Sequence, residues 1–347
     1  MRRPVPVLSA LLVGLLATSC SSGGATQAGS PAASGSAARP AGDAGSASAQ
    51  AAKDPASVHA NELGAVPVLM YHQLTEHPAS VYDRTPADFR AELERLASEG
   101  YVPITAAEFT SGRIDIPAGA HPVVLTFDDS TNSQVRLGSD GQPAPDTALG
   151  ILLDVAKRHP SFPARATFFV NSEPFSETGG KQALAWLTAH GFEVGNHTMD
   201  HANLRTLGAD EVQHEIAGDL KEIKQLAPGA TVTSFALPFG AMPQPSSLAV
   251  RGTSQGVSYQ HRGVYLVGAN PSVSPFAASF DPTAIPRIRS EAATGEEAEY
   301  GSTSWLDKLA KDPSNRYTSD GNPNTVAFPK SEESRLAPAY RTQARAY

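Results

Sequence analysis

Two pairs of polar side chains in this sequence could bind a divalent metal ion. Asp128 and Asp129 follow an apolar run at residues 121–127. His197 and His201 lie four positions apart, after a glycine and an asparagine. Adjacent carboxylates repel each other unless they share a proton or a cation, and imidazoles at i and i+4 lie on one side of a helical turn. One carboxylate and two imidazoles would leave coordination positions for water and substrate, and the spare carboxylate could act as a base.

Each pair taken alone has a simpler explanation. Two aspartates at the end of a strand often begin a turn or cap a helix. Most histidine pairs with this spacing face solvent. The two pairs together favour a metal site, because both follow apolar strands whose ends would meet at the same mouth of a barrel.

The elements that must position these residues alternate between strand and helix. From about Val66 to Arg289, short apolar runs alternate with segments of helical periodicity. Pro86 begins one helix after Thr85, and Gly100 ends it. About seven such units closing on themselves predict an α/β fold, a distorted (β/α) barrel. The expected strands lie at residues 66–71, 121–127, 166–170, 192–194, 233–237, 264–268 and 285–288, and the other helices at 146–158, 181–190 and 212–223.

The N-terminus has the features of an export signal. "MRRPVPVLSALLVGLLATSC" has a basic start and an apolar run that is too short to span a bilayer comfortably. Cys20 is the only cysteine, so it cannot form an internal disulfide. Its position after "LATS" resembles a bacterial lipobox, in which the cysteine is lipidated; the alternative is a plain signal peptide with a coincidental cysteine. We expect an exported protein that is anchored to the membrane by lipid at Cys20 and faces the extracellular side.

The remaining organisation follows from composition and charge. We expect a signal peptide at 1–20, a disordered Ser/Gly/Ala-rich tether at 21–60, one domain at 61–330 and a C-terminal tail at 331–347 that packs on the barrel. A short helix is expected within residues 304–312. The formal net charge of −8 argues against nucleic acid as a partner. We expect a monomer.

Three short motifs resemble a known family. "TFDD", "HTMDH" and "LPFG" occur in the order and spacing of the first three motifs of the polysaccharide deacetylases of the NodB homology type, carbohydrate esterase family 4. The resemblance covers about Val66 to Arg289. It implies that Asp128 is the general base and that the metal, most often zinc, is bound by the three residues Asp129, His197 and His201.

The resemblance also implies a reaction, the hydrolysis of an acetyl group on a sugar. Asp128 would take a proton from a water molecule that the metal activates. The metal and the backbone amide of Phe239 would stabilise the oxyanion. A protonated histidine would then give its proton to the leaving amine.

The sequence departs from the family pattern at three points. Ala236 stands where many members have an arginine that orients the base, and Ser130 stands where a glycine is usual. The C-terminal motif that carries the acid histidine is not visible. However, "VPVLMYH" resembles the first strand of the subgroup that acts on glucosamine exopolysaccharides, where this strand supplies the acid.

Because the first and last strands of a closed barrel are neighbours, an acid histidine supplied by the first strand in place of the C-terminal motif needs little change in geometry. This arrangement makes His72 the candidate acid and Arg287, in "IPRI", the candidate replacement for the missing arginine. The alternatives are a buried histidine bonded to backbone for His72 and a structural salt bridge for Arg287.

We therefore expect a metal-dependent deacetylase that acts on an acetylated amino-sugar polysaccharide. One alternative is an esterase that removes O-acetyl groups from a polysaccharide such as xylan. Another is a polysaccharide-binding protein that kept the fold and lost turnover. Ala236 favours this last alternative, and the presence of all four aspartate and histidine residues of the motifs argues against it.

Overall fold

The computed structural model describes residues 53–175, 180–295 and 297–347. The expected signal peptide, Cys20 and the tether up to residue 52 lie outside these ranges. Within them, no helix has both the length and the apolar character that a membrane crossing requires.

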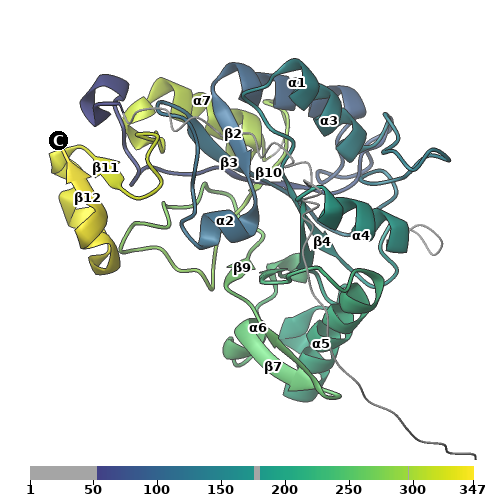
Figure 1. Cartoon of the computed structure of the whole chain (residues 1–347). Helices are drawn as coiled ribbons and strands as arrows, with labels where there is room; N and C mark the ends of the chain where they lie inside the picture. Colours follow the sequence, from purple (N-terminus) through teal and green to yellow (C-terminus); the bar gives the residue numbers. More distant parts are fainter. Residues whose placement is uncertain (1–52, 176–179, 296) are drawn as a thin grey trace, which may run out of the picture. The chain divides into compact units, whose positions relative to one another are not determined.

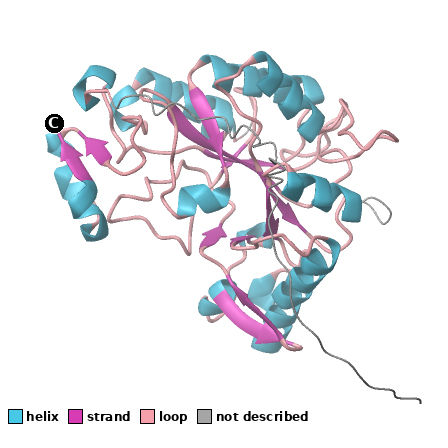
Figure 2. Ribbon diagram, viewed as in Figure 1, coloured by secondary structure: helices cyan, strands magenta, loops and turns pink. Residues whose placement is uncertain are grey.

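A parallel sheet forms the centre of the domain (Figure 2). The strand order is β10-β1-β3-β4-β5-β6-β9, and β2 pairs with the first half of β3. The strands are β1 (Val68–Tyr71), β2 (Tyr101–Ile104), β3 (His121–Phe127), β4 (Thr167–Val170), β5 (Glu193–Asn196), β6 (Ser234–Ala236), β9 (Gly263–Tyr265) and β10 (Ile288–Arg289).

The first and last strands of the sheet are neighbours, as the barrel prediction requires. Leu69 of β1 pairs with Ile288 of β10 on one side and with Leu125 of β3 on the other. The segment before β10 also reaches β9, where the amide of Ile285 donates to the carbonyl of Val264 at 2.9 Å. The sheet therefore curls into a distorted (β/α) barrel, and the predicted fold class is confirmed.

Helices cover the outside of the sheet. In Figure 1, α1, α3 and α7 lie along one part of the sheet, and α4 and α5 lie beside β4 and the strands that follow. Thr85 caps α1 as predicted, since its hydroxyl accepts a hydrogen bond from the amide of Asp88 at 3.0 Å. The helices are α1 (Pro86–Ser98), α2 (Ala106–Thr110), α3 (Ala148–Arg158), α4 (Gly180–Ala189), α5 (Ala209–Leu226), α6 (Ser247–Val250) and α7 (Ser302–Lys311).

The side chains of each strand alternate between two apolar cores. Leu69 and Leu125 belong to the core that packs against α1, α3 and α4. Val68 and Val124 belong to the core inside the barrel, together with Phe169. Because side chains alternate with a period of two, residues 72, 126 and 128 continue the inner face of β1 and β3.

Several elements were not expected from the sequence. β2 was missed, as were the hairpin β7 (Arg251–Ser254) and β8 (Val257–Gln260) and the parallel pair β11 (Val326–Phe328) and β12 (Ala344–Ala346). The predicted end of the tether at residue 60 is too late. Pro55–Val58 forms a 3-10 helix and Ala60 is buried, so these residues are part of the folded domain. Likewise, β12 lies in the predicted C-terminal tail at 331–347 but pairs with β11, which precedes the predicted domain end at residue 330.

Glu62 joins the N-terminal segment to the C-terminal part of the chain. Its side chain accepts hydrogen bonds from the amide of Ala327 at 2.8 Å and from the hydroxyl of Ser319 at 3.3 Å. The residue is only 2 % exposed. Burial raises the pKa of Glu62 to about 8, and the charge of Asp320 adds to this effect. Glu62 is therefore protonated in the folded protein at neutral pH.

This burial predicts a dependence of stability on pH. Between about pH 4.5 and 8 the unfolded chain loses the Glu62 proton while the folded protein keeps it, so the free energy of unfolding falls as pH rises. At about 1.4 kcal/mol per pKa unit, the shift from 4.5 to about 8 corresponds to a loss on the order of 5 kcal/mol. Urea unfolding between pH 5 and 8 should show this slope, and Glu62→Gln should flatten it. Glu333→Gln, at an exposed position of the tail, serves as control; an equal slope in Glu62→Gln would contradict the prediction.

Candidate metal centre and active site

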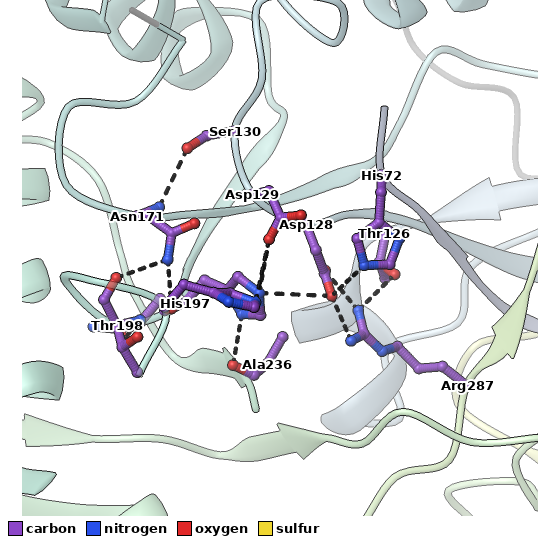
Figure 3. A network of polar contacts seen from close by, with 12 residues as sticks. His72, Thr126, Asp128, Asp129, Ser130, Asn171, His197, Thr198, Ala236 and Arg287 are labelled. Carbon is purple, nitrogen blue, oxygen red and sulfur yellow. Dashed lines mark hydrogen bonds and ion pairs between the residues drawn. The ribbon is translucent and has the colours of Figure 1, made fainter. Parts of the chain in front are cut away.

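The candidate residues converge at the C-terminal ends of the parallel strands. His72 follows β1, Asp128 and Asp129 follow β3, and His197 follows β5. Since all these strands run in the same direction, their ends lie at the same mouth of the barrel. Figure 3 shows His72, Asp128, Asp129 and His197 pointing toward one another.

Asp129, His197 and His201 form a cluster with the dimensions of a metal site. The Oδ1 atom of Asp129 lies 3.4 Å from Nε2 of His197 and 3.4 Å from Nε2 of His201. One ligand atom from each residue lies within 4.8 Å of the other two. Asp129 Oδ1 and His197 Nε2 are buried and make no hydrogen bond to any described residue. Buried polar atoms normally have a partner, and a divalent cation between these atoms would provide one.

His197 is prepared to bind a metal through Nε2. Its Nδ1 lies 2.8 Å from the backbone oxygen of Ala236, so Nδ1 carries the proton and Nε2 keeps its lone pair. Burial lowers the pKa of His197, but the carboxylates of Asp128 and Asp129 raise it above its usual value. This direction shows that the surroundings favour a positive charge at this point, as expected of a cation site.

The two histidines do not lie on a helix, which corrects one step of the sequence argument. Residues 197–203 form an irregular loop. Thr198 and His201 have φ angles of 67° and 51°, in the left-handed region that side chains other than glycine rarely adopt. These bends bring the two imidazole rings to 5.0 Å between centroids.

The backbone around the aspartates is bent in the same way. Asp129 and Ser130 have φ angles of 74° and 46°. In a regular strand the side chain of residue 129 would point away from that of residue 128. The left-handed backbone at Asp129 instead allows both carboxylates to face the mouth of the barrel. The glycine that is usual in the family at position 130 would adopt this φ without strain.

Arg287 forms a buried, bidentate ion pair with Asp128. Its Nη1 lies 2.7 Å from Oδ1, and its Nη2 lies 2.6 Å from Oδ2. Its remaining donors bond Thr126 Oγ1 at 3.1 Å and the carbonyl of Leu266 at 2.8 Å. Burial alone would raise the pKa of Asp128, but the charges of Arg287 and His197 hold it well below its usual range. Asp128 is therefore ionised and fixed in orientation.

His72 lies beside this carboxylate. Its Nε2 is 4.0 Å from Oδ2 of Asp128, and its side chain is 15 % exposed. Its Nδ1 is buried and has no hydrogen-bond partner among the described residues, so the alternative of a histidine bonded to backbone is wrong. Burial lowers the pKa of His72, and the carboxylates of Asp128 and Asp129 offset this only in part.

An open cavity of about 310 Å³ gives access to these groups. His72, Asp129 and His201 line it, and so do the aromatic residues Tyr82 and Phe239. The Phe239 side chain is 65 % exposed and its ring lies 4.5 Å from that of His201. A larger cavity of about 720 Å³ lies beside His59, His121 and Arg316 and contains none of the candidate catalytic groups, so its size does not make it the active site.

Three residues that support the site, of which Gln134 and Asp219 are buried, were missed by the sequence analysis. Gln134 donates to the carbonyls of His72, at 2.9 Å, and of Asp128. Asn171 donates to the carbonyl of His197 at 2.7 Å. Asp219 accepts from the amide of His197 at 3.2 Å, and burial raises its pKa well above the usual value. Only Asp219 had a signal in the sequence, as an acidic residue beside the apolar stripe of α5.

The geometry predicts metal binding in a fixed ratio. Protein dialysed against zinc should retain about one ion per chain, since one set of three ligands converges. Asp129→Ala and His197→Ala should each abolish this retention, as measured by elemental analysis. Asp200→Ala, an exposed aspartate in the same loop, should retain the ion. Unchanged binding in both ligand variants would show that the cluster does not hold a metal.

The ion pair with Arg287 predicts a large effect on stability. Arg287→Met would leave the carboxylate of Asp128 buried without a cation, so the free energy of unfolding should fall by about 3–5 kcal/mol. The double variant Asp128→Asn/Arg287→Met removes both charges and should recover part of this loss. Urea unfolding measures both. A loss below about 1 kcal/mol in the single variant would mean that the pair is not formed.

Comparisons with known proteins agree with this geometry. Residues 115–253 match the family model described as polysaccharide deacetylase. A chitooligosaccharide deacetylase of Sinorhizobium fredii is 31% identical over 122 residues, which are 35% of this chain and 48% of the relative. One of Bradyrhizobium is 27% identical over 202 residues, covering 57% of this chain and 82% of the relative. This chain thus spans about half of the first relative.

A crystal structure from Bacillus anthracis, described as a polysaccharide deacetylase, has the same fold. Its TM-score is 0.50 at 17% identity, and the alignment covers 70% of this chain and 69% of that one. The matched residues 115–253 include both candidate aspartates and both candidate histidines. Residues 115–253 of the chain thus resemble the polysaccharide deacetylase family.

Proposed function

We propose that this protein is a metal-dependent hydrolase that removes acetyl groups from an acetylated amino-sugar polysaccharide. The observation that carries the proposal is the position of an ionised carboxylate, Asp128, beside both the three-residue cluster and a candidate acid. Its Oδ2 atom lies 3.9 Å from Nε2 of His197 and 4.0 Å from Nε2 of His72.

The ligand set fits zinc. One carboxylate and two imidazoles from Asp129, His197 and His201 are hard and borderline donors that zinc, cobalt and nickel accept. When bound there, a divalent ion would lower the pKa of a water molecule and polarise the acetyl carbonyl.

Asp128 has the properties that a general base needs. It is ionised, and Arg287 holds both of its oxygens in place. Each carboxylate oxygen can accept two hydrogen bonds, so Oδ2 can still take a proton from the attacking water. Arg287 also stabilises the negative charge of Asp128 until the water is in place.

His72 completes the reaction on the leaving-group side. As the acetyl carbon–nitrogen bond breaks, the nitrogen needs a proton, and His72 lines the cavity at the position from which one can be delivered. The products are acetate and a free amine. The backbone amide of Phe239 is the candidate protein donor to the oxyanion of the acetyl group.

The test is acetate release from N-acetylglucosamine oligomers by the zinc-loaded protein. Asp128→Asn should lower kcat by about 100-fold or more, because the base is lost. His72→Gln should lose a similar factor on the amide and keep most activity on 4-nitrophenyl acetate, whose leaving group needs no proton. His214→Gln, at an exposed position, is the control.

The same assay separates the alternatives. Acetate release from acetylated xylan and from no N-acetyl substrate would identify an O-acetyl esterase. Binding to the oligomers without acetate release, in zinc-loaded protein, would identify a binding protein. Either result would overturn the proposed reaction.

A further inference from the structure

A chain of contacts runs from the end of β10 to the candidate acid, and the proposed reaction does not account for it. The ring of Tyr82 lies with its centroid 4.9 Å from that of His72, at an interplanar angle of 64°. The guanidinium of Arg289 lies 5.4 Å from the centroid of the same tyrosine ring. Tyr82 thus contacts both the imidazole of His72 and the guanidinium of Arg289.

Arg289 is itself held firmly. Its Nη2 lies 2.7 Å from Oε2 of Glu291, and its Nη1 lies 2.9 Å from Oε2 of Glu297. The Arg289 side chain is 12 % exposed. A cation within about 6 Å of an aromatic ring attracts its face. Arg289 therefore restricts the ring of Tyr82 through a cation–π contact.

The loop that carries Tyr82 is folded back over His72. The amide of Arg84 donates to the carbonyl of Gln73 at 3.0 Å, and the amide of Thr75 donates to the carbonyl of Arg84 at 2.9 Å. These bonds close the loop at its base. At its tip, Oδ2 of Asp83 accepts from the amides of Ala79 and Ser80 at 2.9 and 3.0 Å.

The imidazole of His72 lacks the usual means of fixing its orientation. A catalytic histidine is normally oriented by a hydrogen bond to the ring nitrogen that does not react. Nδ1 of His72 is buried without such a partner among the residues that the structure describes. Packing against the ring of Tyr82 restricts rotation of the imidazole, while Nε2 lies 4.0 Å from Oδ2 of Asp128.

We propose that Tyr82, backed by Arg289, is a positioning residue that holds the His72 ring in the orientation for proton donation to the leaving amine. The inference rests on the proposed function, since it assigns His72 the role of acid. It gives Arg289 and its partners Glu291 and Glu297 a role in positioning His72, although none of these three described residues lines the cavity.

The test uses Arg289→Met in the full-length, zinc-loaded protein, because Arg289 lies outside the cavity. On N-acetylglucosamine oligomers we expect kcat to fall by about tenfold, a fraction of what a general acid contributes, with KM within about twofold. Hydrolysis of 4-nitrophenyl acetate should stay within about twofold, because its leaving group needs no acid. Arg158→Met, which breaks ion pairs to Glu94 of α1 and Asp154 of α3, should change neither activity.

A second pair of variants tests Tyr82 itself. Tyr82→Leu should lower kcat on the amide substrate by at least as much as Arg289→Met does. Tyr82→Phe, which keeps the aromatic ring, should retain the wild-type kcat. Tyr300→Ala, at another exposed tyrosine, is the control. If Tyr82→Leu raises only KM, Tyr82 is a platform for sugar and the inference is overturned.

A readout without activity separates this inference from the proposed function. The ring signal of His72 in carbon–proton NMR, identified by its loss in His72→Gln, should be single in the wild type and broaden or split in Arg289→Met. Full amide activity and an unchanged signal in Arg289→Met would overturn the inference and leave the proposed function intact. A wild type that releases no acetate, with the signal change still present, would overturn the proposed function alone.

Discussion

The buried ion pair between Arg287 and Asp128 is the contact on which the rest of the site depends. A carboxylate inside a barrel would be costly to bury alone, and the bidentate guanidinium offsets this cost. The pair keeps Asp128 ionised and turns Oδ2 toward His72 and His197. Because Arg287 directly precedes β10, the same contact helps to seat the last strand beside the first. The geometry of the base and the closure of the barrel thus depend on one interaction.

The candidate metal ligands are held in another way, by a strained backbone that polar side chains support. Left-handed φ angles at Asp129, Thr198 and His201 turn the two segments that carry the candidate ligands toward one point. Such conformations persist only where the surroundings fix them. Asn171 and Asp219 provide this support, since both bond to the backbone of the histidine loop.

Much of the fold could be predicted because its signals are local. The apolar runs predicted seven strands of the barrel, and the Thr85–Pro86 pair predicted the start of α1. β2 was missed because Pro103 argues against a strand. Proline is tolerated here because β2 is an edge strand that, among the described strands, pairs only with β3. The β7–β8 hairpin was missed because its turn is Gln255-Gly256, which is not one of the strong turn sequences.

The site was predicted only in part, because only some of its residues lie in local sequence motifs. The motif residues were found, but helical spacing was the wrong explanation for the approach of His197 and His201, which left-handed bends in a loop bring about. Gln134, Tyr82 and Glu62 act through partners far away in the sequence, and no local pattern marks such a role. Their contacts exist only once the chain has folded.

The pairing of β1 with β10 has a consequence for the order in which the site is assembled. The segment that matches the family contains the candidate metal ligands and the candidate base, while the candidate acid precedes it and Arg287 follows it. A growing chain would therefore contain every candidate ligand before it contained the arginine that fixes Asp128. Hydrolytic competence would arrive only with the final barrel strand.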